Sequence, residues 1–241
     1  RHPVRESRFE RFAAGRTPWV PWHLDWIADK GLAHVMVDTP AGELMVANTH
    51  LQSSYLSGDY RAIQLAQMSQ LSDWIGPCGA VPCNGVAPLI LAGDLNTTPD
   101  ALALRLLSAR SAVEPSSIAF DLDHLMHRSG SGMRLHARST EWLFTEAVTL
   151  PSGTVTPLSD HPCLLAEYVL EPCDGCAATD ATPWPAVSAE LGVFVEAQRP
   201  VVSRATWLGR AGGLVAVWSG WFLWRSRSVK RLRLVLLPLL A

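Results

Sequence analysis

A short apolar run that leads through a polar tetrad into a helix constrains the fold of this chain most. Residues 88–92 are apolar, as expected of a β-strand buried on both faces, and Gly93-Asp94-Leu95-Asn96 follows directly. Thr98, Pro99 and Asp100 then predict a helix start, with an N-cap, a proline at the first helical position and a charge that suits the helix dipole. Such strand–loop–helix units are typical of α/β layers, in which ligands collect at the carboxyl ends of strands.

The segments around this unit have patterns of their own. Residues 32–39 and 44–50 have strand composition, and Pro40-Ala41-Gly42-Glu43 between them predicts a β-hairpin. Residues 59–75 predict an amphipathic helix, and residues 163–170 predict the last strand of the domain. The apolar positions of the predicted helix are Ile63, Ala66, Met68, Leu71 and Ile75.

The charge of the chain is unevenly distributed. Residues 1–170 contain 12 Lys and Arg against 17 Asp and Glu, whereas five of the eight basic residues that follow lie between Arg225 and Arg233. A domain that binds DNA phosphates needs a basic surface where it works. We therefore expect no nucleic-acid partner.

The end of the chain has the composition of a membrane anchor. Residues 206–224 are mainly apolar, and Arg210 is the one charged residue among them. A spanning helix needs roughly 20 mainly apolar residues. The basic run that follows would suit the cytoplasmic flank. We also expect the domain that precedes the tail to lie on the cytoplasmic side of the membrane. Residues 232–241 leave the number of spans open, and a buried hairpin of a soluble domain is the alternative.

The five cysteines form no regular framework. Cys173 and Cys176 have CxxC spacing, but no second pair completes a zinc site. We expect ordinary thiols in a reducing compartment.

Four polar motifs occur at predicted strand ends. Each one alone can be explained as turn chemistry, so their conjunction and order carry the interpretation. They are Asn48-Thr49-His50-Leu51, Gly93-Asp94-Leu95-Asn96, Leu122-Asp123-His124 and Ser159-Asp160-His161.

In this order, the motifs resemble those of the endonuclease/exonuclease/phosphatase (DNase I-like) superfamily. Its members carry Thr-His-Leu, Gly-Asp-hydrophobic-Asn, Arg-hydrophobic-Asp-Tyr and Ser-Asp-His, and the resemblance covers residues 22–170. Pro157-Leu158-Ser159-Asp160-His161, and Asp25-Trp26 followed by Lys30-Gly31, resemble the neutral sphingomyelinase and inositol phosphosphingolipid phospholipase C branch. A membrane-spanning carboxy-terminal tail is also typical of that branch.

The resemblance implies an α+β fold in three parts. Residues 1–171 would be the carboxy-terminal portion of a four-layer α/β/β/α sandwich that lacks its amino-terminal half, residues 172–205 a linker, and residues 206–241 a hydrophobic tail with one or more membrane helices. The family's main metal ligand, a Glu, and an early Asn belong to the missing half. Unpaired strand edges would also be exposed. We expect this polypeptide alone to be inactive and poorly stable.

The activity implied is hydrolysis of a membrane sphingophospholipid, sphingomyelin or an inositol phosphosphingolipid, to ceramide and a phosphorylated head group. A cation, Mg²⁺ or Mn²⁺, would polarise the phosphoryl group while a base deprotonates water. The implied roles are a general base at His161, its orienting acid at Asp123, a water-positioning carboxylate at Asp94, a phosphoryl-oxygen donor at Asn96, a donor to the phosphate or leaving group at His50, and a carboxylate beside the metal at Asp160.

Two departures from the family pattern leave other interpretations open. The Arg-hydrophobic-Asp-Tyr motif reads Asp121-Leu122-Asp123-His124, and only 28 residues separate Asp94 from Asp123. A nuclease or inositol-polyphosphate phosphatase of the same superfamily, or a catalytically dead membrane scaffold, are the alternatives. The sequence carries no signal for head-group choice, organelle or oligomeric state.

Overall fold

The chain folds around one six-stranded mixed sheet. The computed structural model describes residues 2–15, 25, 28–54, 60–76, 87–116, 122–130, 132–174, 176 and 184–199. The strand order of the main sheet is β1-β2-β3-β4-β6-β5. Its strands are β1 (Val4–Arg11), β2 (Gly31–Thr39), β3 (Gly42–His50), β4 (Leu89–Asp94), β5 (Glu114–Pro115) and β6 (Asp123–Arg128).

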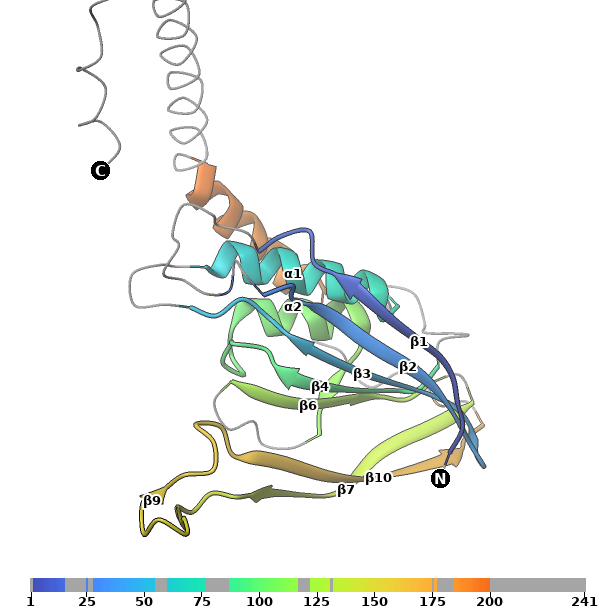
Figure 1. The fold of residues 1–241 in the computed structure, drawn as a ribbon. Coiled ribbons are helices and arrows are strands. Elements are labelled where there is room, and N and C mark those ends of the chain that lie inside the picture. The colour runs from blue at the N-terminus through green and yellow to red at the C-terminus, as the bar shows by residue number, and fades with distance from the viewer. Residues whose placement is uncertain are drawn as a thin grey trace, which may run out of the picture. The chain divides into compact units, whose positions relative to one another are not determined.

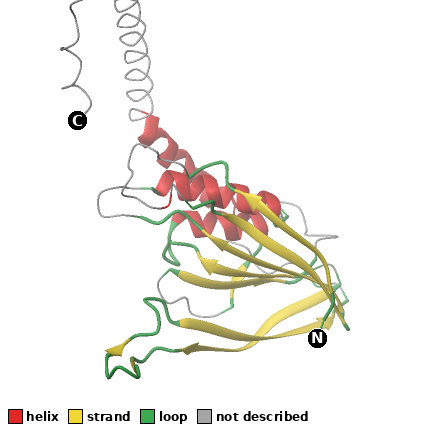
Figure 2. Ribbon diagram, in the orientation of Figure 1, coloured by secondary structure: helices red, strands yellow, loops and turns green. Residues whose placement is uncertain are grey.

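The main sheet is covered differently on its two faces. Helices α1 (Arg61–Trp74) and α2 (Leu102–Ser111) pack on one face, and a two-stranded sheet of β7 (Met133–Leu143) and β10 (Cys163–Pro172) lies on the other (Figures 1 and 2). A small hairpin of β8 (Val148–Thr149) and β9 (Val155–Thr156) interrupts the connection from β7 to β10. Of the four layers predicted, the described residues supply three, and the α+β class is as expected.

Strand register decides which side chains face which layer. Leu89 and Leu91 of β4 are buried beneath the helices, as are Met45 and Ala47, their partners on β3. Ile90, which points to the other face, is only half-buried. The prediction that β4 is buried on both faces is therefore correct for one face, because the two-stranded sheet covers the other face incompletely.

Most predicted elements are confirmed, with one error at a helix start. The β2–β3 hairpin, α1, β4 and β10 lie where the sequence places them. Helix α2, however, begins at Leu102 and its N-cap is Ala101, without a side-chain cap. The predicted cap fails because the hydroxyl of Thr98 donates to Asp100 Oδ1 at 2.7 Å and so is not used on a helical amide.

The buried side of α1 also differs from the apolar pattern. Met68, Leu71 and Ile75 are buried as predicted, but Ile63 and Ala66 are half-exposed. Gln64 and Gln67 occupy the buried side in their place. Hydropathy alone misassigns them because both amides find hydrogen-bond partners inside the protein.

A buried arginine connects the sheet to both helices. Arg128, at the end of β6, is fully buried and donates to the carbonyls of Ile75 and Gly76, which follow α1, at 2.8 and 3.1 Å. It also donates to the carbonyl of Ser111, the last residue of α2, at 2.9 Å. Burial lowers the pKa of Arg128 to about 10, so the guanidinium stays charged at neutral pH and serves the orphan carbonyls of two helix ends.

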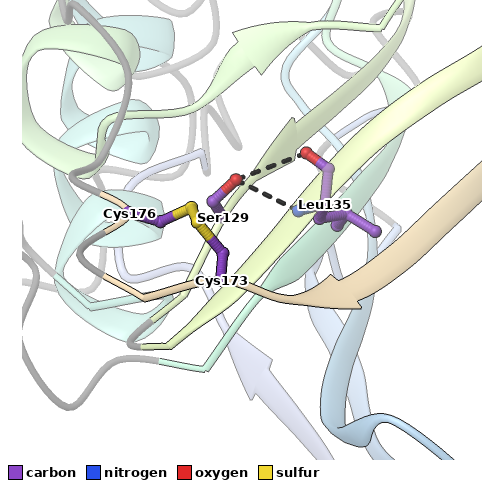
Figure 3. Close-up of a disulfide and its surroundings, with 4 residues drawn as sticks. All are labelled: Ser129, Leu135, Cys173 and Cys176. Atoms are coloured by element: carbon purple, nitrogen blue, oxygen red, sulfur yellow. Dashed lines mark hydrogen bonds between the residues drawn. A yellow bond between two sulfur atoms is a disulfide. The ribbon is translucent and has the colours of Figure 1, made fainter.

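A disulfide follows β10. Cys173 and Cys176 are joined, and Figure 3 shows the bond beside Ser129, whose hydroxyl contacts both backbone polar atoms of Leu135 on β7. The expectation of ordinary thiols is therefore wrong for this pair. Spacing alone could not decide between thiols, a metal site and a bond. Cys163 is a free, exposed thiol.

The carboxy-terminal part forms a second unit. The chain divides into residues Arg1–Glu190 and Leu191–Ala241, and a helix over residues 184–199 begins in the first unit, inside the predicted linker. Val187 is fully buried, and Glu190 pairs with Arg105 at 2.6 Å. The predicted membrane segment, 206–241, lies outside the described residues, within which no helix is long and apolar enough to cross a membrane. The predicted domain boundaries stay predictions.

Replacing Arg128 with Met should destabilise the first unit by about 2–4 kcal/mol, because the carbonyls at two helix ends lose a charged donor. Urea unfolding followed by circular dichroism measures this loss. Arg138→Met, which removes an exposed pair with Glu167, is the matched control and should cost less than about 1 kcal/mol. Equal losses in the two variants would contradict the role given to Arg128.

Candidate active site

Three polar side chains lie in one row at the end of the main sheet. His50 is the last residue of β3 and pairs in register with Asp94, the last residue of β4. Asp94 in turn pairs with Asp123, the first residue of the antiparallel strand β6. Paired residues point to the same face. Strand register therefore brings together residues that are up to 73 positions apart, on the face opposite the helices.

The position before this row requires glycine. Gly93 has φ +146°, and a Cβ added there would lie 1.8 Å from the carbonyl oxygen of Thr49. Any side chain at this position would push β3 away from β4 just below His50 and Asp94. The glycine of the motif therefore sets strand spacing and has no chemical role of its own.

His161 joins the row from another part of the chain. It lies in the loop before β10, and its Nδ1 is 2.5 Å from Asp123 Oδ2. The hydrogen bond to Asp123, with the negative charges of Asp94 and Asp160, raises the pKa of His161. Because Nδ1 is committed to the carboxylate, Nε2 is the ring nitrogen that remains to exchange a proton with a ligand, and the side chain is 41% exposed.

His50 has the opposite electrostatic balance. Its Nε2 lies 3.4 Å from Asp94 Oδ2. Burial and the positive charge of Lys30 lower the pKa of His50, and the charges of Asp94 and Asp25 offset this only partly. The pKa values of the two imidazoles near Asp94 are thus shifted in opposite directions. Such a difference is typical of sites that separate acid and base roles.

Asn96 is placed as part of the framework around this row. It is buried, with φ +49°, and its Nδ2 donates to the carbonyl of Leu51 at 2.9 Å. Its backbone N–H donates to Asp94 Oδ1 at 2.8 Å. The predicted contact with a phosphoryl oxygen would use the second N–H of the amide, and it stays a prediction.

A largely buried ion pair lies next to the row. Lys30 Nζ is 3.0 Å from Asp25 Oδ1 and donates to the carbonyl of Leu51 at 2.6 Å. Asp25 Oδ2 also accepts from Gln52 Nε2 and from the backbone N–H of Ser53. Burial lowers the pKa of Lys30, while Asp25 and Asp94 act against the shift. Asp25 and Lys30 carry a family resemblance in the sequence, but the motif does not predict that they lie beside the site, and Gln52 has no signal in the sequence.

His124 does not face this row. It replaces the tyrosine of the family motif, points to the helix side of the sheet, and its Nε2 contacts the carbonyl of Thr97 at 2.8 Å. Burial lowers the pKa of His124. Its neutral ring thus supports the loop after β4.

The donor set suits a hard cation. Single ligand atoms of Asp94, Asp123 and His161 all lie within 4.8 Å of one another. Carboxylate oxygens are the protein ligands preferred by Mg²⁺, which usually binds one or two of them and keeps several waters. Asp160, predicted beside the metal, is not in this group, and Ser159 Oγ lies 3.4 Å from its carboxylate. Its role as a ligand stays a prediction.

Proteins similar to this chain include one curated relative and several solved structures. No protein-family model matches the chain. A Schizosaccharomyces pombe protein, inositol phosphosphingolipids phospholipase C, is 26% identical over 128 residues, which are 52% of this chain and 29% of that protein. Among solved structures, D. rerio TDP2 complexed with a single-strand DNA product matches with a TM-score of 0.51 and 15% identity, over 70% of this chain and 69% of that one. Sphingomyelinase C from Streptomyces griseocarneus matches with a TM-score of 0.46 and 21% identity, over 68% of this chain and 64% of that one.

The resemblance to inositol phosphosphingolipid phospholipase C that the sequence motifs predicted is confirmed by this relative. At 15% identity, the likeness to TDP2 shows a shared fold alone. The chain also spans only 29% of its curated relative, so the activity of the whole protein is a matter for proposal.

Replacing Asp123 with Asn should lower the pKa of His161, because the neutral amide no longer stabilises the protonated ring and the proton leaves at a lower pH. A pH titration of the histidine ring signals by NMR measures this directly. His127 is an internal control, since its pKa is lowered mainly by burial and depends on Glu114 and not on Asp123. An unchanged His161 titration would show that the bond does not form in solution.

Proposed function

We propose that the protein carrying this chain is a metal-dependent phosphodiesterase that cleaves a sphingophospholipid, either sphingomyelin or an inositol phosphosphingolipid, to ceramide and a phosphorylated head group. The observation that carries the proposal is the 2.5 Å contact between His161 and Asp123, beside Asp94 and His50 at one sheet end. The similarity to an inositol phosphosphingolipids phospholipase C supports the substrate class.

The arrangement can activate a water molecule for attack on phosphorus. His161 Nε2 accepts the proton of the water, and Asp123 fixes the tautomer and stabilises the imidazolium that forms. The carboxylate of Asp94, in the same row, would orient the water. The new P–O bond forms as the bond to the ceramide oxygen breaks. That oxygen takes a proton from solvent water, and the imidazolium of His161 returns its proton to solvent after the reaction.

The cationic and neutral donors next to the row suit a phosphate diester. Lys30 provides a positive charge, and His50, with its lowered pKa, provides a neutral ring that can donate one hydrogen bond to the phosphate or leaving group. A bound Mg²⁺ or Mn²⁺, held by Asp94 and Asp123 with water and substrate oxygens, would neutralise charge on the phosphoryl group. No further protein ligand to the metal is proposed among the described residues.

The surface beside His161 is suited to a lipid substrate. The β7–β10 connection, residues 144–158, runs into Ser159-Asp160-His161 and contains Glu146 as its one charged residue. Its large apolar side chains are exposed: Phe144, Leu150, Val155 and Leu158 are 62, 40, 66 and 56% exposed. An apolar, nearly uncharged hairpin at the edge of a polar site favours a substrate embedded in a bilayer over a soluble one. The predicted tail, 206–241, would hold the domain at the same membrane.

The His161→Ala variant of the full-length protein should lose activity by roughly 10²–10⁴-fold, the contribution expected of a general base. Release of labelled head group from sphingomyelin and from an inositol phosphosphingolipid, with Mg²⁺ and with EDTA, measures it. His136→Ala, which alters an exposed histidine on β7, is the control. Unchanged turnover in His161→Ala would refute the mechanism, and cleavage of DNA in preference to either lipid would refute the substrate class.

Replacing Val155 and Leu158 together with Ser should reduce turnover of substrate in vesicles by at least about tenfold, because one fully buried side chain of this size already contributes about 1.5–3 kcal/mol and a factor of ten corresponds to about 1.4 kcal/mol. Turnover of a short-chain, water-soluble substrate should change little. Val4→Ser serves as the control, because Val4 is also exposed but lies at the opposite end of the main sheet from His50. Equal losses on both substrates would show that the hairpin does not act through the membrane.

A further inference from the structure

A buried glutamine on α1 connects the two loops that follow the site strands. Gln64 is 3% exposed, and its Nε2 donates to the carbonyl of Gln52 and to the carbonyl of Asn96, both at 2.8 Å. Gln52 lies two residues after His50, and Asn96 lies two residues after Asp94. One amide group therefore binds both segments that leave the row of site residues.

These two segments also depend on each other. The backbone N–H of Leu51 donates to the carbonyl of Asp94 at 3.0 Å, and Asn96 Nδ2 donates back to the carbonyl of Leu51. Asn96 holds a left-handed backbone conformation, which residues with a side chain adopt at an energetic cost. A bond from outside, aimed at the Asn96 carbonyl, helps to maintain this strained conformation.

Packing alone does not explain an amide at this position. Gln64 lies on the buried side of α1 together with Leu65, Met68 and Leu71. A leucine or methionine there would bury apolar surface without the cost of desolvating an amide. The amide is favoured here because it donates hydrogen bonds to two carbonyls of the site loops, those of Gln52 and Asn96.

We propose that Gln64 is a positioning residue for the reaction: it fixes the separation of the His50 and Asp94 loops and so keeps the two side chains aligned for the phosphodiester. The inference rests on the proposed function. Gln64 itself lies behind the row and does not contact the substrate. Its effect is on geometry, and small displacements of catalytic groups reduce turnover more than they reduce binding.

The same helix provides a matched control one turn further on. Gln67 is fully buried, and it also makes hydrogen bonds with both atoms of its amide, accepting from the backbone N–H of Gln52 and donating to the carbonyl of Ala14. No contact joins it to the loop of Asn96 within the part of the chain that the structure describes. Loss of a buried glutamine is therefore common to both variants, and loss of the bridge is specific to Gln64.

The test compares Gln64→Met with Gln67→Met in the full-length protein. Both variants should lose similar stability in urea unfolding. Only Gln64→Met should lower kcat, by about 10–100-fold, with KM changed by less than about threefold. Gln64→Glu keeps the size but leaves at most one donor, so it cannot bridge both carbonyls and should also lower kcat. Equal losses of kcat in the Gln64 and Gln67 variants, or none in either, would overturn the inference.

Amide hydrogen exchange gives a second readout that needs no activity. The N–H groups of Leu51 and Asn96 donate to Asp94, and that of Leu95 donates to the carbonyl of Leu122. They should exchange faster in Gln64→Met than in Gln67→Met, because only the first variant releases the Asn96 loop. Equal exchange in the two variants would overturn the inference even if the wild type were active. A wild type that cleaves no phosphodiester would defeat the proposed function, while the exchange comparison would still decide whether Gln64 holds the loops.

Discussion

The register between β3, β4 and β6 is the constraint on which the site depends. Pairing places His50, Asp94 and Asp123 side by side, and a shift of one residue would turn each of them to the helix side of the sheet. The close approach of Gly93 to Thr49 allows the strands to pair at this point. The fold thus supplies the alignment that isolated side chains would have to pay for in entropy on binding a ligand.

The local electrostatics follow from the charged neighbours of each ring. His161 is bonded to the carboxylate of Asp123, so its pKa rises, whereas the pKa of His50 falls because partial desolvation and the positive charge of Lys30 outweigh the charges of Asp94 and Asp25. These opposite shifts arise within one small cluster that shares Asp94. Sequence motifs name the residue types in such a cluster, but the direction of each shift depends on burial and on neighbours distant in sequence.

The sequence was sufficient for the elements with strong periodicity and for the residues of the motif row. The β2–β3 hairpin, β4 and β10 have clear apolar patterns and turn signals, and the order of the polar motifs predicted that His161 and Asp123 would meet. Burial of Gln64 and Gln67 could not be predicted, because their partners are backbone carbonyls and amides of other loops. Neither could β7, whose alternation is weak, since most of its residues are exposed. The start of α2 failed for a local reason, the competition of Asp100 for the hydroxyl of Thr98.

The hydrogen bonds of Arg128 affect how the first unit unfolds. Arg128 lies on β6 and pairs in register with Leu89, which pairs with Met45. Its guanidinium donates to carbonyls at the ends of both α1 and α2. Neither helix can lift from the sheet without breaking bonds to the same side chain. The helical layer and the central strands should therefore open as a single foldon, and partial unfolding should begin instead at the exposed β8–β9 hairpin.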